Sequence, residues 1–165
     1  MYIRSYKEED APILRDLFWN TVHTVNAVDY TRIQLDAWAP VEYDRNAWNQ
    51  RFLDHTTFVV ENDGQIVGFG DIDAQGYLDR LFVHKDHQNE GICDALEALA
   101  TKRVITQASI TAKPFFAHRG YRCIQKQIVY VRGVAMEKNH FISRFYVRIC
   151  IDTLKSLILH SVSML

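Results

Sequence analysis

The stretch from Gly76 to Leu99, GYLDRLFVHKDHQNEGICDALEAL, decides the fold, because a strand, a turn and a helix follow one another in it without spare residues. Residues 77–83 alternate well enough for a strand, and apolar residues from Ile92 to Leu99 recur at helical spacing. The polar loop between them lies where a strand ends and the amide N–H groups of a helix start are unpaired, which favours an anion. Gly91 lets the backbone bend there and approach a ligand closely.

Strands and helices are predicted on both sides of this stretch. Two strands over residues 57–61 and 65–71 are joined by Asn62-Asp63-Gly64, a hairpin signal in which glycine supplies the left-handed position. Further strands are predicted over residues 2–5, 104–108 and 123–132, and a last one of open register between residues 134 and 147. Helices are predicted from Ala11, from Thr31 and after Asp44, and a short helix over residues 112–118 that ends at Gly120.

Composition limits the class of protein. A chain of 165 residues is long enough for one domain with a substantial core and too short for two ordinary ones. Hydrophobic residues make up 48% and charged residues 24%, which is typical of a globular protein rather than a disordered one. The formal net charge of -1 gives no electrostatic reason to expect binding to nucleic acid, so none is predicted.

Cysteine and histidine usage bears on compartment and on metal. The N-terminus, MYIRSYKEED, has neither the apolar segment nor the cleavage site of a secretory signal. Cys93, Cys123 and Cys150 contain no C-x-x-C motif and are odd in number, which indicates a reducing compartment, and we expect the cytoplasm. Because His84 and His87 have no companion pair at zinc spacing, no metal site is predicted.

The C-terminal extension, residues 148–165, is unusually apolar. Over the whole apolar tail, residues 141–165, every possible membrane span is interrupted by Arg144, Arg148, Asp152 or Lys155, so we expect no membrane segment. If the extension is helical, its charged residues share one narrow stripe and leave a wide apolar face to be covered. Packing on its own domain and a contact between two subunits of a homodimer both remain open.

Three separated segments resemble the GNAT superfamily, the acyl-CoA-dependent N-acetyltransferases. The loop Gln88, Asn89, Glu90, Gly91, Ile92, Cys93 resembles the Q/R-x-x-G-x-G/A loop of motif A, which cradles the CoA pyrophosphate; Cys93 replaces the usual Gly or Ala, and Glu90 stands where the family often has Arg, Lys or Gly. Residues 108–121, ASITAKPFFAHRGY, resemble motif B of a bacterial subgroup. Residues 29–40, DYTRIQLDAWAP, resemble that subgroup's substrate-side helix, and the resemblance ends near residue 141.

The resemblance implies an α/β (α+β) fold in one domain over residues 1–165. Its central, mostly antiparallel twisted sheet would have six to seven strands flanked by about four helices. Acetyl-CoA is the implied cofactor. The main chain of Leu81, Phe82 and Val83 would bind its pantetheine where two strands splay apart, the loop over residues 88–93 would bind its pyrophosphate, and Ser109 and Phe116 of motif B would complete the site.

Acetyl transfer to an amine also needs a base, and the chain offers several carboxylates. Asp79 is two residues before Leu81, so we expect it to share that residue's face of the strand and to reach the amine directly or through water. Asp71 and Asp73, in the preceding strand and turn, are alternatives. Each of the three can equally be a solvated turn or edge carboxylate.

The general acid is where the sequence departs from the family. Many GNAT enzymes have a tyrosine at the position of Phe116, and phenylalanine donates no proton. Either the thiolate leaves unaided, because a thiol is only weakly basic, or Tyr121 or Tyr130 takes this role.

Aromatic residues concentrate in the first third of the chain, where the helix from Ala11 is predicted to bury Ile13, Leu14, Leu17, Phe18, Thr21 and Val22. By resemblance, the first two helices form a wall of the acceptor cleft, and Tyr30, Trp38 and Tyr77 are the predicted substrate-binding residues; core packing is the alternative for each ring. The expected acceptor is the primary amine of a small molecule, attacked directly in a ternary complex. The alternative is a non-catalytic acyl-CoA-binding or oligomeric interaction module on the same fold.

Overall fold

A computed structural model describes residues 1–92 and 103–143 of the chain. The predictions for Cys93, for the helix beyond Ile92 and for the extension over residues 148–165 lie outside these residues.

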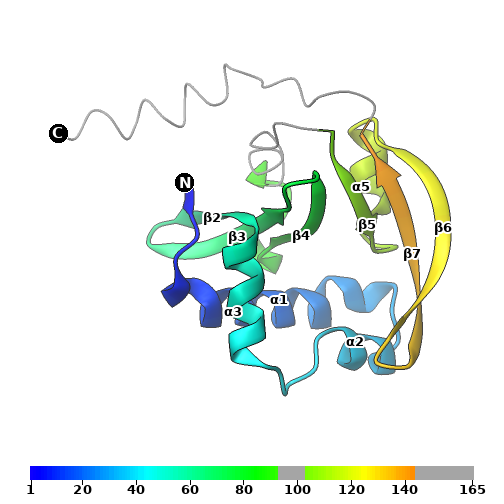
Figure 1. Cartoon of the computed structure of the whole chain (residues 1–165), viewed down its shortest axis with the longest axis horizontal. Coiled ribbons are helices and arrows are strands. Elements are labelled where there is room, and N and C mark those ends of the chain that lie inside the picture. Colours follow the sequence, from blue (N-terminus) through cyan, green and yellow to red (C-terminus); the bar gives the residue numbers. More distant parts are fainter. Residues whose placement is uncertain (93–102, 144–165) are drawn as a thin grey trace.

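The described strands form one seven-stranded sheet in the order β1-β2-β3-β4-β5-β7-β6 (Figure 1). Its β4–β5 pair is parallel and its other pairs are antiparallel, which confirms the predicted, mostly antiparallel sheet. The strands are β1 (Tyr2–Ser5), β2 (Thr56–Asn62), β3 (Gln65–Ile72), β4 (Tyr77–Val83), β5 (Ile105–Ala108), β6 (Arg122–Val131) and β7 (Val134–Ile142).

The described helices begin and end close to the predicted positions. They are α1 (Ala11–Thr24), α2 (Arg32–Trp38), α3 (Arg45–Asp54) and α5 (Lys113–His118), with 3-10 turns at Glu8–Asp10, Asn26–Val28 and Lys85–His87. The Thr31 hydroxyl accepts a hydrogen bond from Gln34 N, and the Asp44 carboxylate accepts from two amides at the start of α3. These side chains satisfy amide groups that a helix start leaves unpaired. No helix in the described part of the chain combines the length and the apolar character that a membrane crossing requires.

The helices cover the sheet on two sides. The largest core cluster joins α1, α2 and α3 to β2, β3 and β7, with Leu14, Phe52 and Phe69 fully buried. A second cluster on the opposite face joins α5 to β4, β5 and β7 around Phe116. The prediction that Ile13 belongs to the buried face of α1 is wrong, since its side chain is 50% exposed. Ile13 lies about 100° around the helix from Leu14, which faces the sheet.

Two irregularities in the sheet matter for the site. The β3–β4 ladder pairs Asp71 with Arg80 but Ile72 with Leu78, so Asp79 is an extra residue and forms a β-bulge in β4. The β6–β7 hairpin turns at Arg132 and Gly133, both with positive φ, as a two-residue hairpin loop of the primed type requires. This turn fixes the register of β7, which the sequence left open.

Candidate active site

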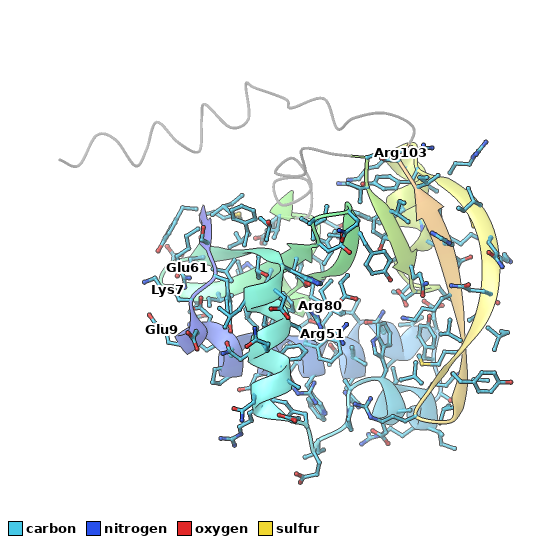
Figure 2. The ribbon with its side chains drawn as sticks, in the orientation of Figure 1. Lys7, Glu9, Arg51, Glu61, Arg80 and Arg103 are labelled. Carbon is cyan, nitrogen blue, oxygen red and sulfur yellow. The ribbon has the colours of Figure 1, made fainter. Side chains whose placement is uncertain are left out.

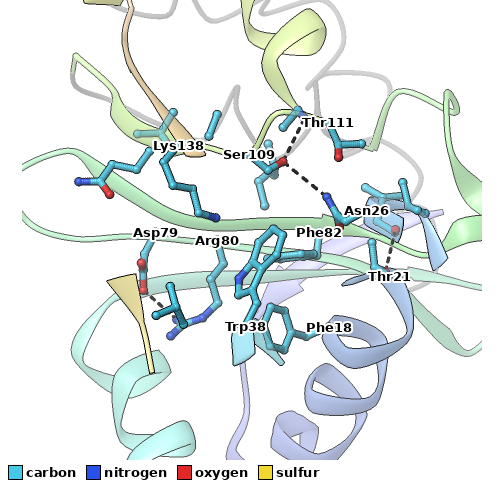
Figure 3. Close-up of a pocket in the computed structure, with 18 of the residues that line it drawn as sticks. Phe18, Thr21, Asn26, Trp38, Asp79, Arg80, Phe82, Ser109, Thr111 and Lys138 are labelled. Carbon is cyan, nitrogen blue, oxygen red and sulfur yellow. Dashed lines mark hydrogen bonds and ion pairs between the residues drawn. The ribbon is translucent and has the colours of Figure 1, made fainter. Parts of the chain in front are cut away.

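The parallel strands β4 and β5 pair only at their starts, through Tyr77 with Ile105 and Leu78 with Thr106. Beyond these pairs the strands separate, and a cleft of about 710 Å³ opens between them (Figure 3). Residues 79–83 of β4 and 106–109 at the end of β5 line it, together with side chains from α1, α2, α3, α5 and β7. The splayed strands predicted from the sequence are therefore present.

The loop after β4 curls back at one end of the cleft. Asn89 and Gly91 both have positive φ, of 65° and 77°, so the left-handed Gly91 is confirmed and Asn89 is a second such residue that the sequence did not signal. The Gln88 side chain, which lines the cleft, donates a hydrogen bond to Val83 O at 2.8 Å and thereby holds the loop to the end of β4. Curled backbone of this kind turns amide N–H groups toward a common point and suits an anion.

The first residue of the following helix anchors this loop to the sheet. Ile92 is 1% exposed and packs with Val60, Val67 and Val83. A Cβ built on Gly68 would lie 2.6 Å from Ile92 Cγ2, so only glycine at position 68 allows this close approach. The predicted contribution of Ile92 to an anion site is thus confined to its backbone.

The Glu90 side chain has a partner within its own loop. Its carboxylate contacts His87 Nδ1 at 2.9 Å within the same loop. This contact holds the Glu90 side chain to its own loop.

Asp79 lines the cleft, but its side chain does not take the face predicted for it. Its Oδ2 lies 3.3 Å from Arg80 Nη1 and 3.4 Å from Nη2 of Arg51 on α3, the two arginines labelled side by side in Figure 2. Leu81, in contrast, packs with the core clusters of the opposite face. The expectation that Asp79 shares the face of Leu81 is wrong because the bulge interrupts the alternation of the strand.

Asp71 is buried and lies outside the cleft lining. Its carboxylate contacts His55 Nδ1 at 2.6 Å and Arg80 Nη1 at 3.0 Å. Burial raises the pKa of this carboxyl, and the Arg80 charge opposes that shift. Single ligand atoms of His55, Asp71 and Asp79 lie within 4.8 Å of one another, but the Arg80 guanidinium bridges the two carboxylates and supplies the cation that balances them. Asp73, the other alternative base, accepts hydrogen bonds from the amides of its own turn.

The cleft has an aromatic wall that contains two of the three predicted acceptor residues. Trp38 and Tyr77 line it, and burial raises the pKa of the Tyr77 hydroxyl. Tyr30 does not line it. Its hydroxyl donates to Glu137 O at 3.0 Å and accepts from Ile110 N at 2.9 Å, while its ring packs edge-on behind Trp38. Tyr30 thus supports the wall from the core.

Motif B contributes Ser109 and Phe116 to the lining. The buried Ser109 hydroxyl accepts hydrogen bonds from Asn26 Nδ2 at 3.5 Å and from Ala112 N at 3.1 Å (Figure 3). Tyr121 is buried behind Phe116, with ring centroids 5.1 Å apart, and Tyr130 is 75% exposed on β6. Neither candidate acid lines the cleft as far as the described residues define it.

The structure adds side chains that the sequence did not single out. Lys138 of β7 places its ammonium group 3.7 Å from the centre of the Trp38 ring, and burial lowers its pKa to about 8. Arg15 of α1 and the rings of Phe18 and Trp48 also line the cleft. A charged residue at position 15, between Leu14 and Leu17 of a predicted buried face, was an available signal for Arg15. Lys138 had none, because the register of its strand was open.

Known proteins share this arrangement. The acetyltransferase (GNAT) domain family matches residues 26–139. The uncharacterized N-acetyltransferase YafP of Escherichia coli K12 is 30% identical over 149 residues, which are 88% of this chain and 93% of that protein. A solved GCN5-related N-acetyltransferase from Rhodopseudomonas palustris, also described as a class-II aminotransferase, has a TM-score of 0.81 at 28% identity over 87% of this chain and 94% of its own.

A more distant structure shares the fold alone. PaiA N-acetyltransferase from Thermoplasma acidophilum, in complex with coenzyme A, has a TM-score of 0.71 at 13% identity, over 87% of this chain and 98% of its own. The family match extends over well over half of the sequence and includes most of the cleft. The chain therefore belongs to the GNAT family of acetyltransferases.

Proposed function

We propose that this protein transfers the acetyl group of acetyl-CoA to the primary amine of a small molecule, by direct attack in a ternary complex. The observation that carries the proposal is the cleft between β4 and β5, with a curled backbone loop at one end and the Asp79 carboxylate, Trp38 and Tyr77 in the lining toward the other. Holding two reactants side by side in one cleft makes their reaction effectively intramolecular, which lowers its entropic barrier.

The loop end fits the phosphate part of acetyl-CoA. Asn89 and Gly91 give the backbone the curl that presents amide groups to an anion, and the PaiA protein of the same fold binds coenzyme A. We assign the pyrophosphate to residues 88–93 and the pantetheine to the main chain of residues 81–83, with Ser109 and Phe116 beside it. Bound acetyl-CoA supplies the activated acetyl thioester.

The other end fits an amine. Asp79 reaches the cleft on a strand bulge, and Arg51 and Arg80 hold its carboxylate in one place. We assign to Asp79 the uptake of the proton that the attacking amine loses, directly or through water. Asp71 is not assigned this role, because it is buried behind Arg80. Trp38 and Tyr77 would contact the acceptor.

The leaving thiolate needs no tyrosine in this proposal, since a thiol is only weakly basic. The placement of Tyr121 and Tyr130 outside the described cleft lining supports this route. The same placement also favours the second candidate function, an acyl-CoA-binding module without turnover. We further propose a single cytoplasmic domain, with the apolar extension over residues 148–165 covering a second copy of the chain in a homodimer.

One experiment separates the two candidates. Thermal unfolding is followed with acetyl-CoA, and thiol release is then measured with a panel of primary amines. Acetyl-CoA at 100 times its Kd is expected to add about 2.7 kcal/mol to the free energy of unfolding. Binding together with amine-dependent thiol release supports the enzyme, whereas binding without release from any amine supports the module. Absence of binding at millimolar acetyl-CoA contradicts both.

A further inference from the structure

Positively charged side chains outnumber negatively charged ones in the described lining of the cleft. Five cationic residues line it, against two carboxylates; they are Arg15, Arg51, Arg80, Arg132 and Lys138, against Asp44 and Asp79. The whole chain has a formal net charge of -1, so this excess is local to the cleft.

Both carboxylates have partners of their own in the structure. Asp44 accepts hydrogen bonds from Asn46 N and Ala47 N at the start of α3. Asp79 is shared between Arg51 and Arg80. Among the described residues, Arg15, Arg132 and Lys138 form no ion pair with a carboxylate, so the lining carries an excess of positive charge.

Among these cations, Lys138 gives the strongest evidence for a missing acidic partner. Its ammonium group rests on the face of Trp38 at 3.7 Å, and no carboxylate of the described residues lies within ion-pair distance of it (Figure 3). Burial lowers its pKa to about 8, with only the more distant charge of Asp79 opposing the shift. A cation partly removed from water without a counter-ion is costly, and an acidic group on a ligand would offset that cost.

Arg15 shows the same pattern on α1. Its guanidinium donates to Pro40 O and lies over the rings of Tyr43 and Phe18, at 4.5 Å and 5.3 Å from their centres. These partners are neutral, so its charge adds to the positive potential of the cleft. Arg132 likewise donates to a neutral group, Ala37 O, at 2.7 Å.

These cations are poorly placed to serve the phosphates of acetyl-CoA. On α1, Arg15 precedes Thr21 by six residues, about 9 Å along the helix axis. Thr21 is the residue that contacts the end of β4, where the loop over residues 88–91 begins. Lys138 contacts Trp38 and interacts electrostatically with Asp79, so it lies at the end proposed for the acceptor.

We infer that the acceptor is an amine that also carries an acidic group, and that Lys138 binds this group across the cleft from Asp79 while the aromatic wall holds the rest of the molecule. This inference rests on the proposed function and names its substrate class. A carboxylate, as in an amino acid, and a phosphate, as in a phosphorylated amine, share the chemistry that an ammonium group recognises. A charged group bonded to Lys138 also provides the counter-ion that the cleft lacks.

The test uses matched acceptors that differ in the acidic group. Thiol release is measured with the common amino acids against their carboxamides, with L-phenylalanine, L-phenylalaninamide and phenethylamine as one set and phosphoethanolamine against ethanolamine as another. We expect at least one acid-bearing acceptor to exceed its neutral counterpart about tenfold or more in kcat/KM, as a charge-assisted hydrogen bond provides. The two sets distinguish a carboxylate from a phosphate.

Variants locate the effect at residue 138. Lys138→Met should bring the acid-to-neutral ratio close to one, and Lys138→Arg should retain most of it, because the charge is kept. Lys126→Met, on the neighbouring strand β6 and outside the described cleft lining, is the matched control and should leave the ratio unchanged.

Three outcomes overturn the inference while leaving acetyl-CoA binding intact. They are equal or better use of the neutral acceptors, an acid preference that survives in Lys138→Met, and no acetylation of any acid-bearing amine. An acetyl group found by mass spectrometry on Lys138 itself, with acetyl-CoA alone, also overturns it, because Lys138 would then be an acceptor. Loss of acetyl-CoA binding would instead contradict the proposed function.

The inference could then still be tested by direct binding of N-acetyl-L-phenylalanine and of its amide. Equal affinity for the two, or tighter binding of the amide, would overturn it.

Discussion

The two ends of the cleft are built in different ways. The loop end is made of backbone from one continuous stretch, in which Asn89 and Gly91 set the curl and Gln88 ties it to β4. The acceptor end is made of side chains from four elements, which are Arg15 on α1, Trp38 on α2, Asp79 on β4 and Lys138 on β7. Backbone geometry serves any acyl-CoA enzyme of this fold, while side chains from scattered elements are free to change with the acceptor. The comparison predicts that changes at one end leave the other unaffected.

The largest effect is expected at Asp79. Asp79→Asn removes the proposed base and should lower kcat about 100-fold or more at neutral pH, within the usual range for general base catalysis. The loss should shrink at higher pH, where more of the amine is already free. Isothermal titration should find acetyl-CoA affinity little changed, since Asp79 stands at the acceptor end. Full activity in this variant would assign the proton to water.

A substitution at Lys138 is expected to increase stability while it removes the preference for acid-bearing acceptors. Burial lowers the pKa of Lys138 from 10.5 to about 8, so the folded state binds fewer protons than the unfolded state between these values, and wild-type stability gains from rising pH across that window. Lys138→Met removes the desolvated charge and should raise the free energy of unfolding by about 3 kcal/mol at pH 7, since each unit of a pKa shift corresponds to about 1.4 kcal/mol. This advantage should disappear by pH 10.5. Urea unfolding at several pH values measures it, with Lys126→Met as the control.

The loop end is tested by Gly91→Ala. Because Gly91 has a φ of 77°, alanine there is strained, and the loop should open or shift. We expect acetyl-CoA affinity to fall about tenfold, which corresponds to about 1.4 kcal/mol. Steady-state kinetics at saturating acetyl-CoA should show an unchanged KM for the amine. A rise in that KM equal to the loss of acetyl-CoA affinity would show that the two ends are coupled.

The smallest effect is expected at Tyr30, which supports the aromatic wall without lining it. Tyr30→Phe keeps the ring against Trp38 but leaves Glu137 O and Ile110 N without their partner. The free energy of unfolding should fall by about 1 to 2 kcal/mol. Thermal unfolding measures this loss, and kcat/KM for the amine should stay within about twofold of wild type. A larger kinetic change would place the Tyr30 hydroxyl in contact with the acceptor.

The same contrast explains how far sequence reasoning reached. The loop end was predictable because its glycine, its strand and its helix start are neighbours in the chain. Caps at Thr31 and Asp44 were predictable for the same reason, since a cap acts on residues two or three positions away. Caps and turn glycines can be predicted without knowing which distant segments contact each other.

The acceptor end depends on contacts between segments that are distant in the sequence. Tyr30 and Trp38 are eight residues apart and both aromatic, and only the partners of the Tyr30 hydroxyl, at residues 110 and 137, decide that it turns into the core. Asp79 was predicted to reach the cleft, but for the wrong reason, because a bulge is defined by pairing with β3 rather than by the strand's own residues. Lys138 required the β6–β7 register, which the Arg132-Gly133 turn sets.

The bulge at Asp79 ties the acceptor end to the hydrophobic core on the far side of the sheet. One residue earlier, Leu78 is buried there with Phe116 and Val104. If β4 lost its extra residue and returned to a regular ladder, every residue before the bulge would exchange faces, and Leu78 would leave that core. A shift that displaced Asp79 would therefore expose a leucine. The orientation of Asp79 in the cleft therefore depends on the burial of Leu78, which lies outside the described cleft lining.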